Sequence, residues 1–382
     1  ETFIRKIIDA ATPKAERELA LLKGDLHPSV KLDGDGRLQG YDLSFSKERY
    51  LKQALNVDED KLSEYFPMQR TFDGLIKIYE AFFGLNFHRV DCPGMWHDSV
   101  QMMEVKRGNK LLGHIAVDLF PREGKYTHAC CSMIVPPYLD EMHEPAPAMA
   151  LVIANFPKPT AQKPSLLKHN QVRTFFHEFG HAIHAVCGNA ELPTVAGYNT
   201  KLDFVEMPSQ ILEEWIWEKD ILKMLGKHYQ TGAAIPDDMI DAKISSQQVF
   251  TGLDTLRQMQ YASMSLEYYK PGKDKDTGDI ARRIRSAILP GLAVSQETHS
   301  EANFGHLMGY GAGYYSYMWS KVFALDIFNA IRADKGLLNS NFGSRYIQQV
   351  IGRGGSCDPN ELVRNFLGRE PNEEAFRTSL GL

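Results

Sequence analysis

Cysteine is scarce in this chain, because only five of its 382 residues are cysteine and their number is odd. None of them forms a C-x-x-C pair, and the adjacent Cys130 and Cys131 do not suggest a disulfide framework. The sequence therefore predicts free thiols, which favour a reducing compartment. We expect a cytoplasmic location, and an organelle reached through a cleaved targeting segment is equally compatible with this pattern.

The chain also lacks a long apolar run and an excess of positive charge. Its longest apolar stretch, residues 148–156, is too short to span a bilayer, and no signal peptide opens the chain. The net charge is -5, and no basic stripe is interleaved with aromatic residues. We therefore expect neither a membrane nor a nucleic-acid partner. Because the first residue is Glu1 rather than Met, we expect a further segment upstream.

What is present suffices for a large core, since 43% of the residues are hydrophobic. Helical periodicity and turn residues divide the single region 1–382 into three parts that differ in predicted secondary structure. Residues 1–84 are expected to be helical, 85–156 to form a small sheet with strands near 100–105, 111–120, 128–135 and 149–156, and 165–382 to be helical again. The predicted fold is mainly α, with a small β-sheet beside a central helix.

One short motif carries the chemistry: His177-Glu178-Phe179-Gly180-His181. Residues four apart lie on one face of a helix, so His177 and His181 can present two imidazoles to one metal ion. Glu178 lies about a quarter-turn away, where its carboxylate can reach a water molecule on the metal. The apolar flanks predict a buried helix over 166–187 that ends at Gly188, and buried histidines need a partner.

A third ligand is expected 25 residues after the second histidine, at Glu206. A catalytic zinc site needs three protein ligands and one open position. Pro208 fits only the first turn of a helix, so a helix over 208–225 places Glu206 at its entrance. Asp203 is expected either to cap this helix or to accept a hydrogen bond from a ligand histidine. His184 is expected to be a packed neighbour rather than a fourth ligand.

A glycine-rich segment over 305–313, followed by tyrosines, offers donors for a reacting carbonyl. Its glycines allow close approach to a ligand, and His306, Tyr310, Tyr314 and Tyr317 supply polar rings. Without the metal motif, a tight turn before a helix would be the preferred interpretation. Beside that motif, we favour a role in binding or stabilising the substrate.

These motifs together resemble the thimet oligopeptidase/neurolysin family of zinc metallopeptidases, which includes oligopeptidase A and dipeptidyl carboxypeptidase. The resemblance rests on the motif at 177–181 and on segments 121–125, 203–210, 304–317, 358–361 and 366–371. It implies one Zn²⁺ per chain, held by His177, His181 and Glu206, with Glu178 as general base. It also implies a large helical fold of the zincin type, with two lobes that line a deep channel.

The resemblance also assigns roles to the rings. Tyr317 matches the family tyrosine that steadies the oxyanion, Tyr314 and Tyr310 match residues that contact substrate, and His306 matches the histidine at the start of the flexible loop. The His306-to-Tyr310 spacing is one residue shorter than in the thimet oligopeptidase type.

Three functions stay open from the sequence. The leading one is a zinc-dependent oligopeptidase that cuts internal bonds of short unstructured peptides. The second is a dipeptidyl carboxypeptidase of the same family. The third is a catalytically incomplete peptide-binding segment that needs a partner chain, because members of the family carry a long helical segment before the part matched here. We expect that segment to precede this chain in the full protein.

Overall fold

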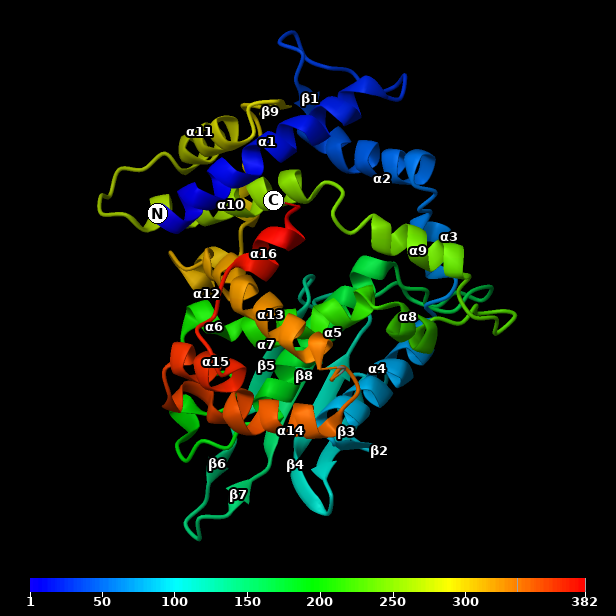
Figure 1. Cartoon of the computed structure of the whole chain (residues 1–382), viewed down its shortest axis with the longest axis vertical. Coiled ribbons are helices and arrows are strands. Elements are labelled where there is room, and N and C mark those ends of the chain that lie inside the picture. The colour runs from blue at the N-terminus through cyan, green and yellow to red at the C-terminus, as the bar shows by residue number, and fades with distance from the viewer. Residues whose placement is uncertain (335, 382) are drawn as a thin grey trace. The chain divides into compact units, whose positions relative to one another are not determined.

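The computed structural model describes residues 1–334 and 336–381 and divides the chain into two compact units. Unit 1 comprises Glu1–Asp58, Asp241–Trp319 and Glu374–Leu382, and unit 2 comprises Glu59–Ile240 and Ser320–Glu373. The predicted fold class is confirmed, since helices dominate and one five-stranded sheet accompanies them (Figure 1). Within the described ranges, we find no helix with the length and apolarity that a bilayer crossing requires.

Unit 1 is helical. Its helices are α1 (Thr2–Gly24), α2 (Leu43–Ala54), α10 (Thr251–Tyr269), α11 (Thr277–Ile288), α12 (His306–Tyr310) and α16 (Glu374–Ser379). Two short strands, β1 (Leu38–Gln39) and β9 (Leu292–Ala293), pair in parallel. The predicted helix over 1–24 is confirmed by α1, which packs on α10. The buried carboxylate of Glu18 accepts the backbone N–H groups of Gly252 and Leu253, at 3.2 and 2.9 Å, and so satisfies the start of α10.

Unit 2 contains the sheet. Its strands are β2 (Asn86–Val90), β3 (Gln101–Arg107), β4 (Lys110–Asp118), β5 (Cys130–Val135) and β8 (Ala148–Ile153), in the order β2-β3-β4-β8-β5. Strands β4 and β8 are parallel, and the other neighbours are antiparallel. A separate hairpin of β6 (Tyr138–Leu139) and β7 (Pro145–Ala146) projects from the unit at the bottom of Figure 1. The four predicted strands are confirmed, and β2 was not predicted.

The helices of unit 2 surround this sheet. They are α3 (Glu59–Ser63), α4 (Met68–Phe83), α5 (His169–Val186), α6 (Leu202–Val205), α7 (Met207–Glu213), α8 (Lys219–Leu225), α14 (Ser340–Gln349) and α15 (Pro359–Leu367). Helix α9 (Asp237–Ser245) and helix α13 (Ser316–Ala333) each contribute residues to both units. Short 3₁₀ turns are η1 (Gly40–Asp42), η2 (Pro193–Val195), η3 (Glu214–Trp217), η4 (Ser300–Asn303) and η5 (Ile351–Ser356).

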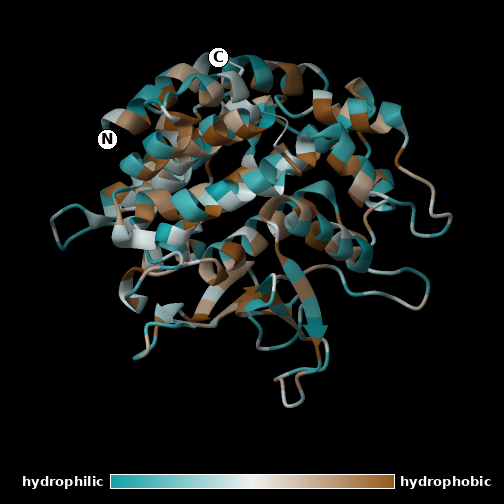
Figure 2. Cartoon of the chain, turned by 60° about the horizontal axis from the view of Figure 1, so that its bottom comes forward, coloured by the Kyte–Doolittle hydropathy of each residue, from teal (hydrophilic) through white to brown (hydrophobic). Residues whose placement is uncertain are grey.

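Helix α5 packs against β8, β5 and β4, so the small sheet lies beside the motif helix as predicted. Every second residue of β8 is buried, which is the pattern of a strand with one covered face. The phenylalanines of the motif helix, Phe175, Phe176 and Phe179, are completely buried. In Figure 2 the helices carry alternating teal and brown bands along their length, as amphipathic helices do.

The motif helix begins three residues later than predicted. Leu166 forms a β-bridge with Pro67, and the N-cap residue Lys168 has an extended backbone conformation. The apolar residues before His169 therefore belong to an extended segment and not to the helix. The predicted end at Gly188 is nearly right, but for another reason. Gly188 has no left-handed conformation, and a Cβ there would lie 2.6 Å from the Gly197 backbone nitrogen. This glycine is required by close chain packing.

One other predicted helix differs from the structure. The single helix expected over 208–225 is divided into α7, a 3₁₀ turn and α8, because the chain is extended at Glu218. The chain after 358, within the range 165–382 that was expected to be helical, carries two helices, α15 and α16.

Candidate metal centre

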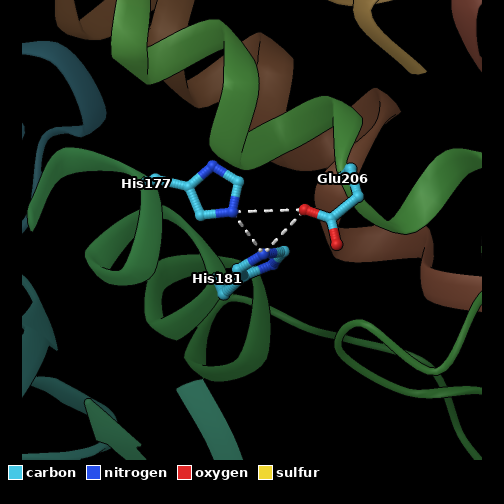
Figure 3. A group of neighbouring side chains, drawn as sticks. All are labelled: His177, His181 and Glu206. Atoms are coloured by element: carbon cyan, nitrogen blue, oxygen red, sulfur yellow. Dashed lines mark hydrogen bonds and ion pairs between the residues drawn. The ribbon is translucent and has the colours of Figure 1, made fainter. Parts of the chain in front are cut away.

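Helix α5 carries both histidines of the motif on one face. Their Nε2 atoms lie 3.2 Å apart, and their side chains are 17% and 12% exposed for His177 and His181 respectively. One carboxylate oxygen of Glu206 lies 3.2 Å from each of the two nitrogens. The three side chains therefore direct their donor atoms at one common point (Figure 3).

Glu206 lies at the entrance of a helix, as the sequence predicted, and a second short helix that was not predicted precedes it. Glu206 follows α6 and serves as the N-cap of α7, and its backbone carbonyl accepts a 2.8 Å hydrogen bond from Ser209 Oγ. The approach of α7 to α5 depends on Gly180 of the motif. A Cβ at that position would lie 2.9 Å from Ser209 Cα, so glycine lets the two helices cross closely.

The orientation of His177 is fixed by a residue that the sequence did not single out. Glu213, at the end of α7, accepts a 2.7 Å hydrogen bond from His177 Nδ1. A neutral His177 that donates through Nδ1 has a lone pair on Nε2. This lone pair faces the anionic oxygen of Glu206, an arrangement that needs a cation or a proton between the two atoms.

Glu213 is itself buried and paired with cations. Its carboxylate lies 2.7 Å from Arg173 Nε and 3.8 Å from Lys321 Nζ. Burial would raise the pKa of Glu213, but Arg173, Lys321 and His177 lower it well below its usual value. Glu213 therefore stays ionised and keeps His177 in the tautomer that a metal ligand needs.

The protonation behaviour of the ligands agrees with a cation site. Burial would raise the pKa of Glu206, but the neighbouring histidines lower it well below its usual value. Burial would lower the pKa of His177, yet the carboxylates of Glu206 and Glu213 raise it to about 10. A group of negative oxygens thus holds positive charge at this point, as protons or as a metal ion.

The spacing of the three donor atoms fits zinc. Ligand atoms bound tetrahedrally at about 2.0–2.2 Å from Zn²⁺ lie about 3.3–3.5 Å apart. The three observed distances of 3.2 Å are close to this range. Two imidazoles and one carboxylate leave a fourth position open, and that is the composition of a hydrolytic site.

Glu178 lies beside the ligands and is 8% exposed. Burial raises the pKa of its carboxyl group, while His177 and His181 oppose the rise. Its charge also contributes to the raised pKa of Cys131 on β5, where burial is the main cause. Glu178 therefore occupies the buried side of the motif helix that faces the sheet.

His184 does not join the metal group. It is 1% exposed and belongs to none of the metal-binding groups formed by the described residues. Burial, with a smaller effect of His181, lowers its pKa to about 3, so its ring is neutral and packed. Asp203 does not cap α7, since Glu206 takes that position, and the backbone carbonyl of Asp203 accepts a 2.9 Å hydrogen bond from Ser320 Oγ. The acceptor for His177 Nδ1 is Glu213.

The four rings expected to serve the substrate lie together in unit 1. The His306 ring centroid lies 5.6, 5.1 and 5.6 Å from those of Tyr310, Tyr314 and Tyr317. Tyr310 and Tyr317 stack at 5.2 Å. His306 and Tyr310 stand on α12, a helix of one turn within the predicted glycine-rich loop, and Gly311 after it has a φ of +53°. Tyr314 Oη donates to Gln258 at 3.1 Å.

The segment 121–125 has a structural role that sequence reasoning did not identify. Lys125 Nζ lies within hydrogen-bond distance of the Asp118 carboxylate and of three backbone carbonyls, those of Asp118, Phe120 and Ala154, at 2.7–2.9 Å. Arg122 and Trp96 also donate to Asp118. This buried network joins the segment that follows β4 to the end of β8.

Comparison with known proteins supports one family. All of residues 1–382 match the family model described as Peptidase family M3. The chain is 38% identical to saccharolysin of Saccharomyces cerevisiae, with 100% of the chain and 56% of saccharolysin covered, and 35% identical to a thimet-like oligopeptidase of Dictyostelium discoideum, with 100% and 58% covered. It thus spans a little over half the length of these relatives.

A solved structure supports the fold alone. The structure called BsuCP superposes with a TM-score of 0.50 at 12% identity, over 99% of this chain and 76% of that one. The resemblance inferred from the motifs is thereby confirmed by comparisons that span the chain from end to end. This chain belongs to peptidase family M3.

Proposed function

We propose that this chain carries the catalytic centre of a zinc-dependent oligopeptidase that hydrolyses internal bonds of short, unstructured peptides. The observation that supports it best is the arrangement of three donor atoms, each 3.2 Å from the other two, beside a buried glutamate. One of the two relatives reported above is named a thimet-like oligopeptidase, in agreement with peptides as substrates. The free cysteines favour a cytoplasmic location.

We assign one Zn²⁺ per chain to His177, His181 and Glu206. The donor set of two imidazoles and a carboxylate suits zinc, and Glu213 fixes the tautomer of His177. Zinc held there would polarise the scissile carbonyl and lower the pKa of a water molecule to about 7.

The chain's own groups then move the proton. We assign Glu178 as the general base that removes a proton from the attacking water as its oxygen bonds to the carbonyl carbon. The same carboxyl group returns that proton to the departing nitrogen as the C–N bond breaks. Water is thus divided between the new carboxyl and the new amine.

The ring cluster of unit 1 receives its roles from the family resemblance. We assign Tyr317 as a hydrogen-bond donor to the oxyanion, with Tyr314 as its companion, and His306 and Tyr310 as substrate-binding residues. The mutual contacts of these rings are in keeping with a shared role.

The proposal is tested with a quenched-fluorescent nonapeptide, with and without 1,10-phenanthroline, a neutral chelator. Glu178→Gln should abolish turnover while zinc content, measured by mass spectrometry, stays at one per chain. Glu191→Gln, at an exposed loop position, serves as the matched control and should keep wild-type turnover. Cleavage that persists in Glu178→Gln, or a chain that holds no zinc, would contradict the mechanism.

The same assay separates two peptidase specificities. A peptide amidated at its C-terminus should be cut as fast as the unblocked one by an endopeptidase. A dipeptidyl carboxypeptidase should lose activity on the amidated peptide, since it requires a free terminal carboxylate.

A further inference from the structure

A cavity of about 450 Å³ lies entirely within unit 2, apart from the metal group. Its walls come from the turn between β3 and β4, the β6–β7 hairpin, the C-terminal end of α5, and the segment of α14 and η5. A volume of this size is typical of a site for a small molecule.

The charged side chains among the described residues of this cavity wall are all positive. Arg107, Lys110 and Arg353 line it, and no Asp or Glu is among the described residues of its wall. Two of the nitrogen atoms of Arg107, Nε and Nη2, are buried and have no hydrogen-bond partner in the described part of the chain. Arg107 is half-buried, and two buried guanidinium nitrogens without partners are costly, so a counter-charge is expected to complete them.

Among the described residues, no carboxylate lines the cavity to provide that counter-charge. Cys187, on the same wall, keeps its thiol neutral, because burial raises its pKa to about 12 although Arg107 opposes the rise. Arg353 Nη2 contacts only a thiol in the described hydrogen bonds, Cys357 Sγ at 3.6 Å. The C-terminal end of α5 carries a partial negative charge, which offsets less than one of the three positive charges of the wall.

The rest of the wall combines the polar side chains of Tyr138, Asn189 and Gln348 with an apolar part made of Leu111, Leu112, Pro137, Leu139, Val186 and Ile347. We propose that this cavity binds a small molecule that carries a phosphate or carboxylate group on an apolar body. The oxyanion pairs with the fork of Arg107, which suits two-point recognition of oxygen atoms, and Lys110 and Arg353 close over it. The apolar body lies against the leucine, proline and valine side chains.

The site is separate from the proposed peptidase centre. The cavity and the metal group share helix α5 but no residue, and Val186 lies five residues beyond His181, about 7.5 Å along the helix axis. The proposal therefore does not depend on catalysis.

Calorimetric titration of the full chain tests the proposal, in phenanthroline-treated protein so that binding at the metal centre does not contribute. The probes are phenyl phosphate, benzoate, inorganic phosphate and the neutral benzyl alcohol. Phenyl phosphate or benzoate should bind at one site per chain, inorganic phosphate more weakly, and benzyl alcohol not at all. The stronger of the first two identifies the oxyanion that the cavity prefers.

Arg107→Gln should weaken this binding about tenfold or more, because charged hydrogen bonds are lost. Arg353→Gln, at an exposed position on the rim, should weaken it less and provides a second variant if Arg107→Gln does not fold. Arg70→Gln, on an exposed face of α4, is the control and should bind as wild type does. Equal affinity in wild type, Arg107→Gln and Arg353→Gln, or no saturable binding of either aromatic anion, would overturn the proposal.

Discussion

At the scale of single residues, the metal centre depends on a glutamate that is not a ligand. Glu213 holds His177 through Nδ1 and is kept ionised by Arg173 and Lys321. Such partners typically change metal affinity by about 10–100-fold when they are removed. The sequence carried a signal for this role, since Glu213 lies seven residues after Glu206, and seven residues make about two helical turns.

Glu213→Gln is expected to weaken zinc binding about 10–100-fold. The glutamine amide is neutral and can both donate and accept a hydrogen bond, so it does not fix the tautomer of His177 as the carboxylate does. Competition with a chromophoric chelator measures the dissociation constant. Glu214→Gln is the matched control, since Glu214 is also buried and pairs with Lys321 rather than with His177. Equal zinc affinity in the two variants would show that Glu213 has no positioning role.

At the scale of elements, the crossing of α5 and α7 sets the ligand geometry. Gly180 stands between the two ligand histidines, and a Cβ there would meet Ser209 Cα at 2.9 Å and Leu212 Cδ1 at 3.1 Å. Because Ser209 and Glu206 belong to the same turn, any displacement of α7 moves the third ligand.

Gly180→Ala is therefore expected to lower both zinc affinity and the free energy of unfolding. Overpacking costs about 1–3 kcal/mol, and alanine regains about 1 kcal/mol of helix propensity, so the net loss is up to about 2 kcal/mol. Urea unfolding and zinc titration measure the two effects. Gly24→Ala, at the end of α1 where a Cβ meets nothing within 4 Å, should leave zinc affinity unchanged and should not lower the free energy of unfolding.

The network at the ends of β4 and β8 predicts a pH dependence of stability. Asp118 is 2% exposed, and although its burial acts to raise its pKa, hydrogen bonds from Arg122, Trp96 and Lys125 hold that pKa well below the usual value. A carboxylate with a lowered folded-state pKa stabilises the protein above its unfolded pKa of about 3.9 and loses this contribution as the pH falls further.

Asp118→Asn should therefore destabilise unit 2 by about 3–5 kcal/mol at pH 7, because two cations lose their partner. The difference in the free energy of unfolding between variant and wild type should shrink as the pH falls from 4 toward 3, because Asp118 of the wild type then becomes protonated in the unfolded chain. Urea unfolding at several pH values measures this. Asp274→Asn, at an exposed position, should give a small difference that does not vary with pH.

The limits of sequence-based prediction are visible in particular elements. The two histidines could be grouped from the sequence because helical spacing places residues four apart on one face, and in the structure their donor atoms lie together with that of Glu206. Strand β2 was missed because it is an edge strand in which no residue is buried. The start of α5 was misplaced because Leu166, an apolar residue in a helical pattern, pairs instead with Pro67. In both cases the secondary structure of the segment depends on contacts with residues that are distant in the sequence.

At the scale of the whole molecule, the three proposed ligands come from α5 and from the junction of α6 and α7, all in unit 2. A bound metal ties these elements together and stabilises the state that binds it. The free energy needed for local unfolding should therefore rise in the elements that carry the proposed ligands. Helices α1 and α10 pack on each other in unit 1 and carry none of them, so their local stability should not change.

Hydrogen exchange of the full chain, with and without zinc, should show slower exchange after metal binding in α5 and α7. The amides of α1 and α10 should exchange at the same rate in both states. His181→Ala, which removes one ligand, should abolish the zinc-dependent difference in α5 while leaving exchange in α1 unchanged. A zinc effect spread evenly over both units would instead mean that metal binding is coupled to the stability of the entire chain.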